Sequence, residues 1–467
     1  MVFSFAPLIP PKDLVGCHQQ ARLQRSESVF DKSSLAQPAA RVPNLTRANM
    51  PVAQPAENST TLRSQKQIFP LRLWWYNLEV MTGRATIHVG LNAHLLSRQA
   101  GYRRGGIHNY IQQLLHHLPA ADPSLQVTVF TSQRREGHET TPDAFEWRTS
   151  RWSTDRPWVR IAWEQLVQPW ALVRAGVHLV HALAFVSPLV TTVPAVITVH
   201  DLSFLRFPER FRPANRLYLS TLTRLSCRRA RRVIAVSQAT ADEVVRLLDV
   251  PVDRVDVVPH GVEHTRFRLL PSALVEAFRR EKGLPERFVL FVGTLEPRKN
   301  LITLVEAFAR MQAVRDKVRL VIAGGKGWYY QEIFKRVEEL GLGKAVYWVG
   351  FVPGAELPLW YNAATVFVYP SLYEGFGMPL LEAMACGTPV IASATSSLPE
   401  VVGDAGLLVT PHDVTGLADN MERLLVDTGW QAELSQRGRA RASTFTWDAT
   451  AQATVASYRR ALVVDAA

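Results

Sequence analysis

Cysteine is scarce in this sequence, and long uninterrupted apolar runs are missing. The 467 residues include three cysteines, Cys17, Cys227 and Cys386, which lie too far apart for a C-x-x-C metal motif. A disulfide framework is excluded for the same reason, and a reducing compartment is expected. The most apolar stretch, residues 177–199, is broken by residues that include His181, Pro188 and Pro194. It therefore falls short of the ~18 apolar residues that a membrane-spanning helix needs, and we expect no span.

Three signature strings of nucleotide and metal sites are also absent. There is no G-x-G-x-x-G, which excludes the usual fingerprint of a nicotinamide dehydrogenase, and no G-x-x-x-x-G-K-[ST], which excludes a P-loop NTPase. No Asp-x-Asp occurs anywhere in the chain. That absence removes the usual carboxylate pair that holds manganese or magnesium beside a diphosphate, so we expect no metal site.

The charge balance is positive, with 53 Lys and Arg against 41 Asp and Glu and a net charge of +12. Such a balance favours acidic partners. The densest basic block begins at Arg206, ends at Arg232 and holds nine arginines against one acidic residue. Leucines alternate with these arginines at roughly helical spacing: Leu217, Leu222 and Leu225. The block is interpreted either as a solvated face or as a contact for an anionic membrane surface. Nucleic acid is disfavoured, because no aromatic-basic platform or zinc-finger spacing accompanies the block.

The first 80 or so residues differ from the rest of the chain. They are rich in Ser, Gln, Ala, Pro and Arg, show no sustained period, and lack the basic-then-apolar order of a signal peptide. We expect residues 1–84 to be a disordered leader or a start assigned too early, with Met81 as the natural start. The remaining length suits two domains, and 47% apolar residues exclude a mostly disordered chain.

From residue 85 onward, short β-branched runs alternate with amphipathic helical stretches. Strands are expected at 85–91, 126–131, 179–183, 195–200, 232–236 and 255–258, and in a second series at 288–293, 319–323, 346–349, 366–369, 389–392 and 406–409. This alternation predicts an α/β protein with two parallel, doubly wound sheets. We expect an N-terminal domain over 85–270, a linker over 271–285, a C-terminal domain over 286–445, and a C-terminal helix over 446–467 that packs back toward the N-terminal domain.

Two adjacent cations follow the strand expected at 288–293. The chain there reads Gly293-Thr-Leu-Glu-Pro-Arg298-Lys299-Asn300. A basic pair at the carboxyl end of a strand, just before a helix, can clamp a diphosphate. This string alone leaves open an exposed Arg-Lys pair in an ordinary loop.

A glycine-containing loop over residues 369–379, YPSLYEGFGMP, precedes a helix that carries Glu382. Gly375 and Gly377 allow the backbone to approach a ligand closely. Pro379 suits the first helical turn, where free N–H groups and the helix dipole favour a phosphate. Glu382 lies about one turn into the helix, where it can accept hydrogen bonds from a ribose diol.

Together these strings resemble the retaining glycosyltransferases of family 4, which have the GT-B fold. The family's E-x7-E pair is matched by Glu374 and Glu382, and its donor-side G.l.prKN string is matched by residues 293–300. Further matches occur in family order from about residue 85 to the C-terminus: Gly105-Gly106, Val199-His200-Asp201, Ala235-Val236-Ser237 and Pro259-His260-Gly261-Val262. The resemblance implies two facing Rossmann-like domains with a deep cleft between them, the C-terminal one binding the nucleotide sugar.

For the nucleotide, the resemblance implies donor-binding roles for four residues. Gly293 would line the site, and Arg298 and Lys299 would bind the donor diphosphate and stabilise the charge that develops on it. Glu382 would hold the ribose hydroxyls.

For the donor sugar, the resemblance implies that Glu374 lies against it and that the amides of Gly375, Phe376 and Gly377 contact its hydroxyls. His200 would face the sugar from the N-terminal domain and contribute to catalysis. A satisfied core histidine at a strand end is the alternative for His200.

On the acceptor side, Gly105 and Gly106 would approach the phosphate and the acceptor. This chain departs from the family's pattern at three acceptor-side positions. It has Asn92 and His94 where Asp and Arg often follow the first strand, and Asn109 where a basic residue often follows the glycines. The identity of the acceptor is therefore left open.

The resemblance implies metal-independent transfer of a sugar from a nucleotide-diphosphate sugar to a hydroxyl of a glycan or lipid-linked acceptor, with retention of configuration and no cofactor. LSFLRFPERF at 202–211 and GGKGW at 324–328 resemble bacterial mannosyltransferase-like members, so GDP-mannose is the first donor to consider. We expect a cytoplasmic enzyme of polysaccharide biosynthesis, peripheral at the inner face of the plasma membrane. The alternatives are a sugar-nucleotide epimerase of the same fold, and a non-catalytic nucleotide-sugar-binding or membrane scaffold protein.

Overall fold

The computed structural model describes residues 86–96, 105–132, 145–152, 154, 156–210, 213–311 and 317–463. These residues all belong to one compact unit that spans Pro70–Ala467. The expectations for residues 1–84 lie outside the described residues.

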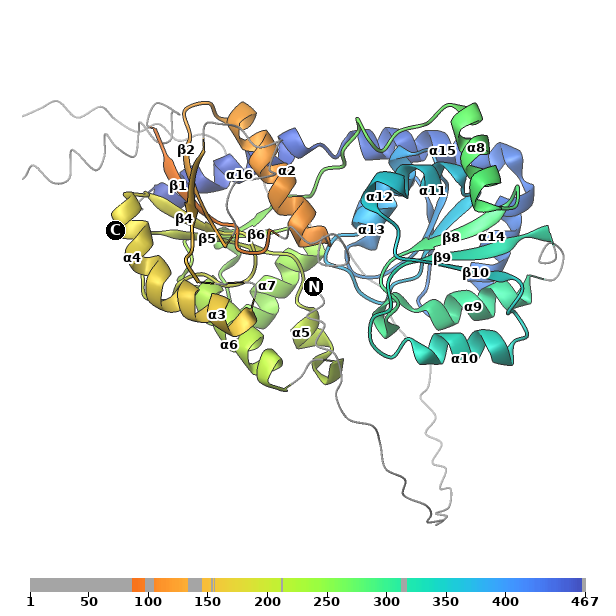
Figure 1. The fold of residues 1–467 in the computed structure, drawn as a ribbon, viewed down its shortest axis with the longest axis horizontal. Helices are drawn as coiled ribbons and strands as arrows, with labels where there is room; N and C mark the ends of the chain where they lie inside the picture. Colours follow the sequence, from red (N-terminus) through yellow and green to blue (C-terminus); the bar gives the residue numbers. More distant parts are fainter. Residues whose placement is uncertain are drawn as a thin grey trace, which may run out of the picture. The chain divides into compact units, whose positions relative to one another are not determined.

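The first sheet contains seven parallel strands in the order β3-β2-β1-β4-β5-β6-β7 (Figure 1). Its strands are β1 (His88–Asn92), β2 (Gln126–Thr131), β3 (Glu146–Thr149), β4 (Leu179–Ala182), β5 (Ala195–Val199), β6 (Arg232–Ala235) and β7 (Val255–Val257). Its helices are α2 (Gly106–Ala121), α3 (Pro157–Ala162), the π-helix η1 (Trp163–Val167), α4 (Gln168–Ala175), α5 (Ser203–Arg206), α6 (Pro213–Arg229) and α7 (Gln238–Leu248). We call this sheet and its helices the N-terminal lobe.

The second sheet contains six parallel strands in the order β10-β9-β8-β11-β12-β13. Its strands are β8 (Phe288–Val292), β9 (Arg319–Ala323), β10 (Val346–Gly350), β11 (Val366–Tyr369), β12 (Val390–Ser393) and β13 (Leu407–Val409). Its helices are α8 (Ser272–Lys282), α9 (Leu301–Arg310), α10 (Gln331–Glu339), α11 (Leu357–Ala363), α12 (Met378–Ala385), α13 (Leu398–Val402), α14 (Val414–Val426) and α15 (Thr428–Ser443). This is the C-terminal lobe, and the predicted pair of doubly wound parallel sheets is confirmed.

All twelve expected strands are present, to within a few residues at their ends, but β3 was missed. Its sequence, Glu-Trp-Arg-Thr, shows no apolar alternation. Its two end residues are exposed and its two middle residues are partly buried. β3 lies at the edge of the sheet and pairs with β2 alone. An edge strand needs no buried faces, so its sequence carries little strand signal.

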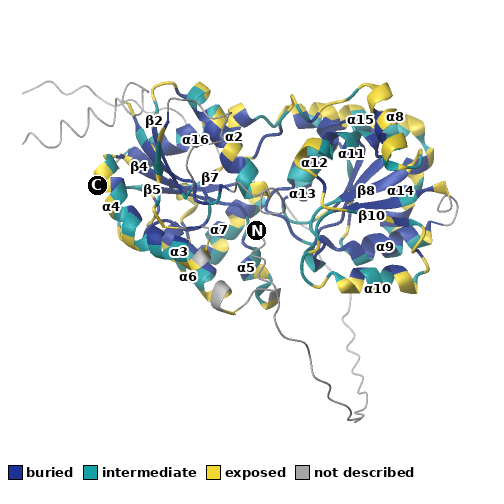
Figure 2. Cartoon of the chain, in the orientation of Figure 1, coloured by how far each residue is buried: buried dark blue, intermediate teal, exposed yellow. Residues whose placement is uncertain are grey.

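Alternate residues of the first sheet enter different cores, as the period of a strand requires. In β5, Val196 packs in the cluster that includes α2, whereas Ile197 and Val199 pack in the cluster that includes α6 and α7. Figure 2 shows the resulting buried strands between helices with exposed outer faces. No helix of the described residues is long and apolar enough to cross a membrane.

The last helix, α16 (Trp447–Leu462), packs on the N-terminal lobe although it follows the C-terminal sheet (Figure 1). Its side chains Trp447, Ala451 and Tyr458 are buried in the same cluster as β1 and α2. The Tyr458 hydroxyl also lies 2.7 Å from Nδ1 of His181 in β4. Helix α16 is therefore part of the core of the first sheet.

Candidate active site

The strand order of the second sheet reverses between β8 and β11, and parallel sheets bind ligands at the carboxyl ends of strands at such a point. The loop after β8 carries Gly293 and ends in a 3₁₀ turn, Pro297–Lys299. Asn300 then adopts a left-handed conformation, φ 56°, and starts α9. The loop after β9 packs tightly against it, since a Cβ on Gly324 would lie 1.8 Å from the carbonyl oxygen of Gly293.

Lys299 and Arg298 converge on one buried carboxylate, that of Glu374 in the loop after β11. Lys299 Nζ donates to Glu374 Oε1 at 2.5 Å, and also to the Tyr369 hydroxyl at 2.5 Å. Arg298 Nη1 donates to Glu374 Oε2 at 2.9 Å. Its Nη2 lies 2.8 Å from Glu296 Oε1. The structure thus brings together three residues that the resemblance placed at the donor phosphates and sugar.

The opposite charges in this cluster stabilise one another's ionised forms. Burial alone would raise the pKa of Glu374, but the Arg298 and Lys299 cations outweigh it and lower that pKa to about 2. Burial lowers the pKa of Lys299, and the Glu374 carboxylate opposes that effect. Glu374 and Glu296 hold the pKa of Arg298 above its ordinary value despite its burial. Two cations, Arg298 and Lys299, are therefore balanced by two carboxylates, Glu374 and Glu296.

The main chain of the loop after Glu374 packs directly against the main chain of the N-terminal lobe. A Cβ on Gly375 would lie 1.7 Å from the carbonyl oxygen of His200, so only glycine fits there. The carbonyl of Gly375 accepts hydrogen bonds from Ser237 Oγ at 2.7 Å and Thr240 Oγ1 at 3.0 Å. Gly377 has φ 115° and forms the N-cap of α12. In the first turn of α12, Pro379 has no N–H and the Leu380 amide donates to the Gly377 carbonyl at 3.0 Å.

His200 follows β5 and is 8% exposed. Its Nε2–H donates to the carbonyl of Leu183 at 2.9 Å, which makes Nδ1 the free lone-pair nitrogen of the neutral ring. Burial lowers the pKa of His200 to about 4, although that hydrogen bond opposes the effect. His200 is therefore neutral near pH 7 and can accept a hydrogen bond.

His260 is a residue of this region to which the sequence assigned no role. It is 6% exposed, and its ring centroid lies 5.5 Å from His200, 5.1 Å from Phe376 and 5.7 Å from Trp447. Its Nδ1 is buried without a hydrogen-bond partner among the described residues. The Pro-His-Gly-Val string was the sequence signal that could have pointed to His260. The glycine of this string is required by the fold, because a Cβ on Gly261 would lie 2.2 Å from the backbone nitrogen of Trp447.

Glu382 lies apart from the cluster on α12. The Tyr361 hydroxyl donates to Glu382 Oε2 at 2.9 Å. Burial raises the pKa of Glu382 to about 7, with Tyr361 and Arg266 opposing the effect. Near neutral pH this carboxyl group is therefore partly ionised, and its ionised form can accept hydrogen bonds from both hydroxyls of a diol.

Gly105 and Gly106 begin α2, with Gly105 as its N-cap. A Cβ on Gly106 would meet no atom within 4 Å, so this turn faces open space. The residues just before it, 97–104, lie outside the described residues.

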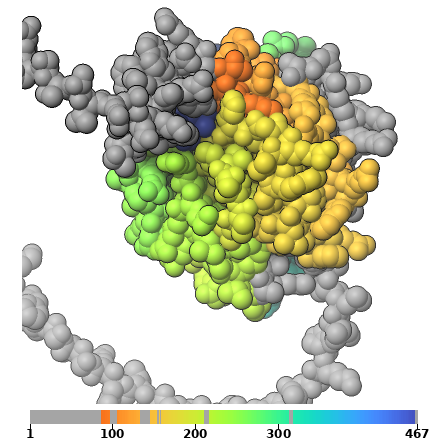
Figure 3. Space-filling model, turned by 90° about the vertical axis from the view of Figure 1, so that its left-hand side faces the viewer, coloured from red at the N-terminus to blue at the C-terminus, as the bar shows by residue number. Residues whose placement is uncertain are grey.

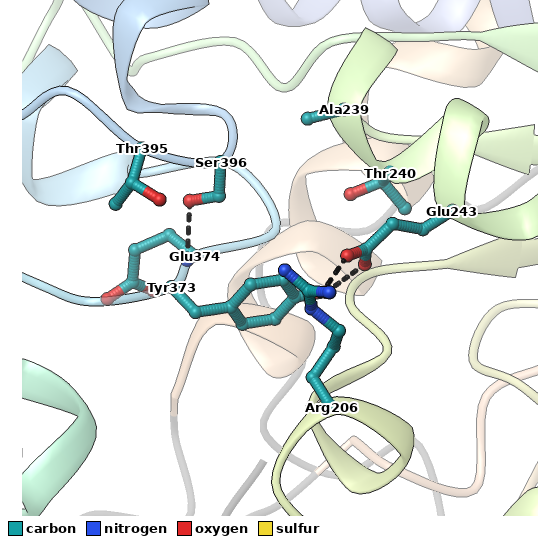
Figure 4. A pocket seen from close by; sticks show the side chains of 8 residues that line it. All are labelled: Arg206, Ala239, Thr240, Glu243, Tyr373, Glu374, Thr395 and Ser396. Carbon is teal, nitrogen blue, oxygen red and sulfur yellow. Dashed lines mark hydrogen bonds and ion pairs between the residues drawn. The ribbon is translucent and has the colours of Figure 1, made fainter. Parts of the chain in front are cut away.

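A small cavity lies between the two lobes beside Glu374 (Figure 4). It is lined by Arg206, Ala239, Thr240, Glu243, Tyr373, Glu374, Thr395 and Ser396. Ser396 has a positive φ of 49°, and its hydroxyl accepts a hydrogen bond from the Glu374 amide at 2.9 Å. Figure 4 also shows the Arg206–Glu243 pair across the cavity from Ser396.

The basic block that begins at Arg206 is partly neutralised within the fold. Arg228 pairs with Asp249 at 2.5 Å, and Arg224 lies 3.5 Å from the same carboxylate. Arg232 pairs with the buried Asp256. Of the three leucines at helical spacing, Leu222 packs against the core, whereas Leu217 and Leu225 are exposed. Among the described residues, no three His, Cys, Asp or Glu side chains form a group that could hold a metal ion.

Two family descriptions match the chain, one for each lobe. Residues 104–266 match "Glycosyltransferase Family 4", and residues 275–441 match "Glycosyl transferases group 1". The chain is 34% identical over 294 residues to the O-antigen chain mannosyltransferase B of Escherichia coli, which covers 62% of this chain and 77% of that protein. It is 32% identical over 275 residues to the serotype-specific mannosyltransferase WbdA of Escherichia coli, but spans only 33% of that protein's length.

Among solved structures, sucrose-phosphate synthase from Thermosynechococcus elongatus aligns with a TM-score of 0.64 and 28% identity. The alignment covers 80% of this chain and 98% of that one. The two parallel sheets, the family matches and the structural match together define a GT-B glycosyltransferase. The chain belongs to glycosyltransferase family 4, whose members are retaining hexosyltransferases that take the sugar from a nucleotide sugar.

Proposed function

We infer that the protein transfers a mannosyl residue from GDP-mannose to a hydroxyl of a glycan or lipid-linked acceptor, in the synthesis of a bacterial surface polysaccharide. The observation that carries the proposal is the buried cluster of Arg298, Lys299 and Glu374 at the switch point of the C-terminal sheet. The relatives named above that are more than 30% identical are mannosyltransferases, which supports mannose as the sugar.

The cluster supplies the electrostatics that the reaction needs. As the bond between the anomeric carbon and the phosphate oxygen breaks, its electron pair leaves on the diphosphate. Arg298 and Lys299 would lie beside that position. Because Glu374 already holds both side chains, they would need little reorganisation to stabilise the charge. The acceptor oxygen forms the new bond on the same face of the sugar, and its proton passes to the departing phosphate oxygen.

The neighbouring groups would position the donor. The amides of Gly375, Phe376 and Gly377 follow Glu374 in the same loop and would contact sugar hydroxyls. Neutral His200 would accept a hydrogen bond from the sugar through Nδ1. Glu382 would hold the ribose.

The test is a donor panel with the purified full chain. Calorimetry with GDP, UDP and ADP would identify the base, and incubation with GDP-mannose or UDP-glucose and a lipid-linked oligosaccharide would identify the sugar and acceptor. The expected result is GDP binding and mannosyl transfer with retention, read from the anomeric proton coupling in the product. Conversion of the donor sugar without any acceptor would indicate an epimerase and overturn the proposal.

A further inference from the structure

The helical segment Pro157–Ala175 presents large apolar side chains to solvent. The exposed fractions are 67% for Trp158, 74% for Leu166, 64% for Trp170 and 59% for Val173. The backbone stays helical through α3, η1 and α4. Surface helices ordinarily turn polar residues outward, so a helix that is apolar on its outer face calls for a partner.

The π-helical turn brings these side chains into one line. In a regular α-helix, about 100° separates successive residues, so Leu166 would point about 80° away from Trp158. The wide turn at Trp163–Val167 takes in about one extra residue, which cancels most of that angle. Trp170 and Val173 then follow at the three- and four-residue spacing of a single stripe.

The inner face of the segment packs against the core of the N-terminal lobe. Trp163 and Leu172 are buried in a cluster with Phe130 of β2. Gln168 is also fully buried, and the Asn92 amide lies 3.4 Å from its Oε1. The stripe is therefore a second apolar face that the fold leaves open.

Helix α6 lies beside α3 and carries a further exposed leucine. Tyr218 of α6 hydrogen-bonds with Arg160 of α3, so the two helices are neighbours, and Leu217 beside it is 68% exposed. In Figure 3 the yellow surface around α3 and α4 adjoins the yellow-green surface of the segment that contains α6. We call Trp158, Leu166, Trp170, Val173 and Leu217 the aromatic stripe.

The exposed charges on α3, α4 and α6 themselves have one sign. From residue 156 to residue 175 the only acidic residue is Glu164, and it is buried; α6 contains no acidic residue. Arg156, Arg174 and Arg216 are exposed. The Arg174 guanidinium lies 5.1 Å from the centre of the Trp170 ring. Basic and apolar groups thus share this surface.

We propose that the aromatic stripe docks on a lipid bilayer that contains anionic headgroups. Tryptophan prefers the depth of the headgroups, leucine and valine insert below it, and arginine pairs with lipid phosphates above it. A second copy of the chain fits less well, because a symmetric contact would place two basic faces against each other. The proposal does not depend on the identity of the donor, and it places membrane contact on residues 158–173 rather than on the basic block alone.

The experiment is vesicle flotation of the full chain with phosphatidylcholine alone and with added phosphatidylglycerol. The parent should float with the anionic vesicles and at least tenfold less with the neutral ones. The double variant Trp158→Ser/Trp170→Ser should lose at least tenfold in partitioning. The matched control is Tyr329→Ser/Phe351→Ser, which removes two aromatic residues of the C-terminal lobe that are 61% and 50% exposed; it should float like the parent.

Three outcomes would overturn the proposal. The parent could fail to float with anionic vesicles, or the double variant could float as well as the parent, which would place any contact elsewhere. Sedimentation could also show a dimer of the parent that the double variant loses while neither floats, which would make the stripe a contact between copies. Donor binding, measured in parallel, reports separately on the proposed function.

Discussion

Lys299 is the residue on which the electrostatics of the donor cluster depend most directly. Its ammonium group contacts Glu374 at 2.5 Å in a buried site, so its removal leaves that carboxylate with Arg298 alone. We expect Lys299→Met to lower kcat by about 10²- to 10³-fold, the cost of losing one preorganised charge at a leaving group. The measurement is steady-state mannosyl transfer.

The matched control for that variant is Lys335→Met, on the exposed face of α10, where the lysine side chain is 77% exposed. It should turn over at the parent rate. Equal rates for Lys299→Met and the parent would remove Lys299 from the proposed chemistry, whereas equal losses in both variants would point to a general effect of charge.

The raised pKa of Glu382 predicts that nucleotide binding depends on pH. Burial raises its pKa to about 7, so the folded protein holds a proton there that the unfolded chain releases near its ordinary pKa of about 4.5. The contribution of this group to stability is therefore present below pH ~4.5 and is lost as the pH rises through about 7. A ribose diol binds better to the ionised carboxylate, because charge-assisted hydrogen bonds are stronger.

We therefore expect GDP affinity to rise several-fold as the pH increases from about 6 to about 8. Calorimetry across that range gives the measurement. In Glu382→Gln the affinity should be lower and its pH dependence flat. A slope that survives in the variant would assign the titration to another group.

At the scale of elements, the N-terminus of α7 is completed by the opposite lobe. Ser237 caps the helix from within, since its hydroxyl accepts from the Thr240 amide at 3.0 Å. The remaining amides, those of Gln238 and Ala239, each donate at 2.7 Å to the carboxylate of Glu400 in α13. The first amides of α7, in the N-terminal lobe, therefore bond to a side chain of the C-terminal lobe. These hydrogen bonds stabilise the contact between the two lobes.

We expect Glu400→Ala to weaken this tie by about 1–2 kcal/mol, which corresponds to a roughly five- to thirtyfold lower kcat/KM for transfer. GDP binding should stay unchanged, because the nucleotide contacts proposed here lie in the C-terminal lobe. Kinetics and calorimetry together give the test. The control is Asp413→Ala, which removes an N-cap within the C-terminal lobe, where Asp413 Oδ1 accepts from Gly416 at 2.8 Å. Equal losses in both variants would mean that only fold stability had changed.

The elements were largely predictable from the sequence because their signals are local. Alternating β-branched runs marked twelve of the thirteen strands, and β3 escaped because an edge strand of four polar and aromatic residues lacks that signal. The site residues were predicted one string at a time. Their pairing was not, because Arg298 and Glu374 are 76 residues apart and meet only when β8 and β11 become neighbours. The same limit applies to His260, which gains its surroundings from Trp447 and Phe376.

At the scale of the whole molecule, α16 returns the end of the chain to the first lobe and is held there by a buried polar chain. The Tyr458 hydroxyl lies 2.7 Å from His181 Nδ1, His181 Nε2 lies 2.8 Å from Thr198 Oγ1, and that hydroxyl lies 3.0 Å from the Tyr110 hydroxyl. Burial lowers the pKa of His181 to about 3, so the ring is neutral and needs both partners.

We expect Tyr458→Phe to destabilise the N-terminal lobe by about 1–3 kcal/mol, because it leaves His181 with one buried nitrogen unpaired. Hydrogen exchange should accelerate in peptides from β1, β4 and β5 and stay unchanged in peptides from β8 and β11, while GDP affinity stays at the parent value. Tyr347→Phe, on a 46% exposed residue of β10, is the control. Faster exchange in both sheets would show that the lobes unfold as one cooperative unit and that α16 stabilises both.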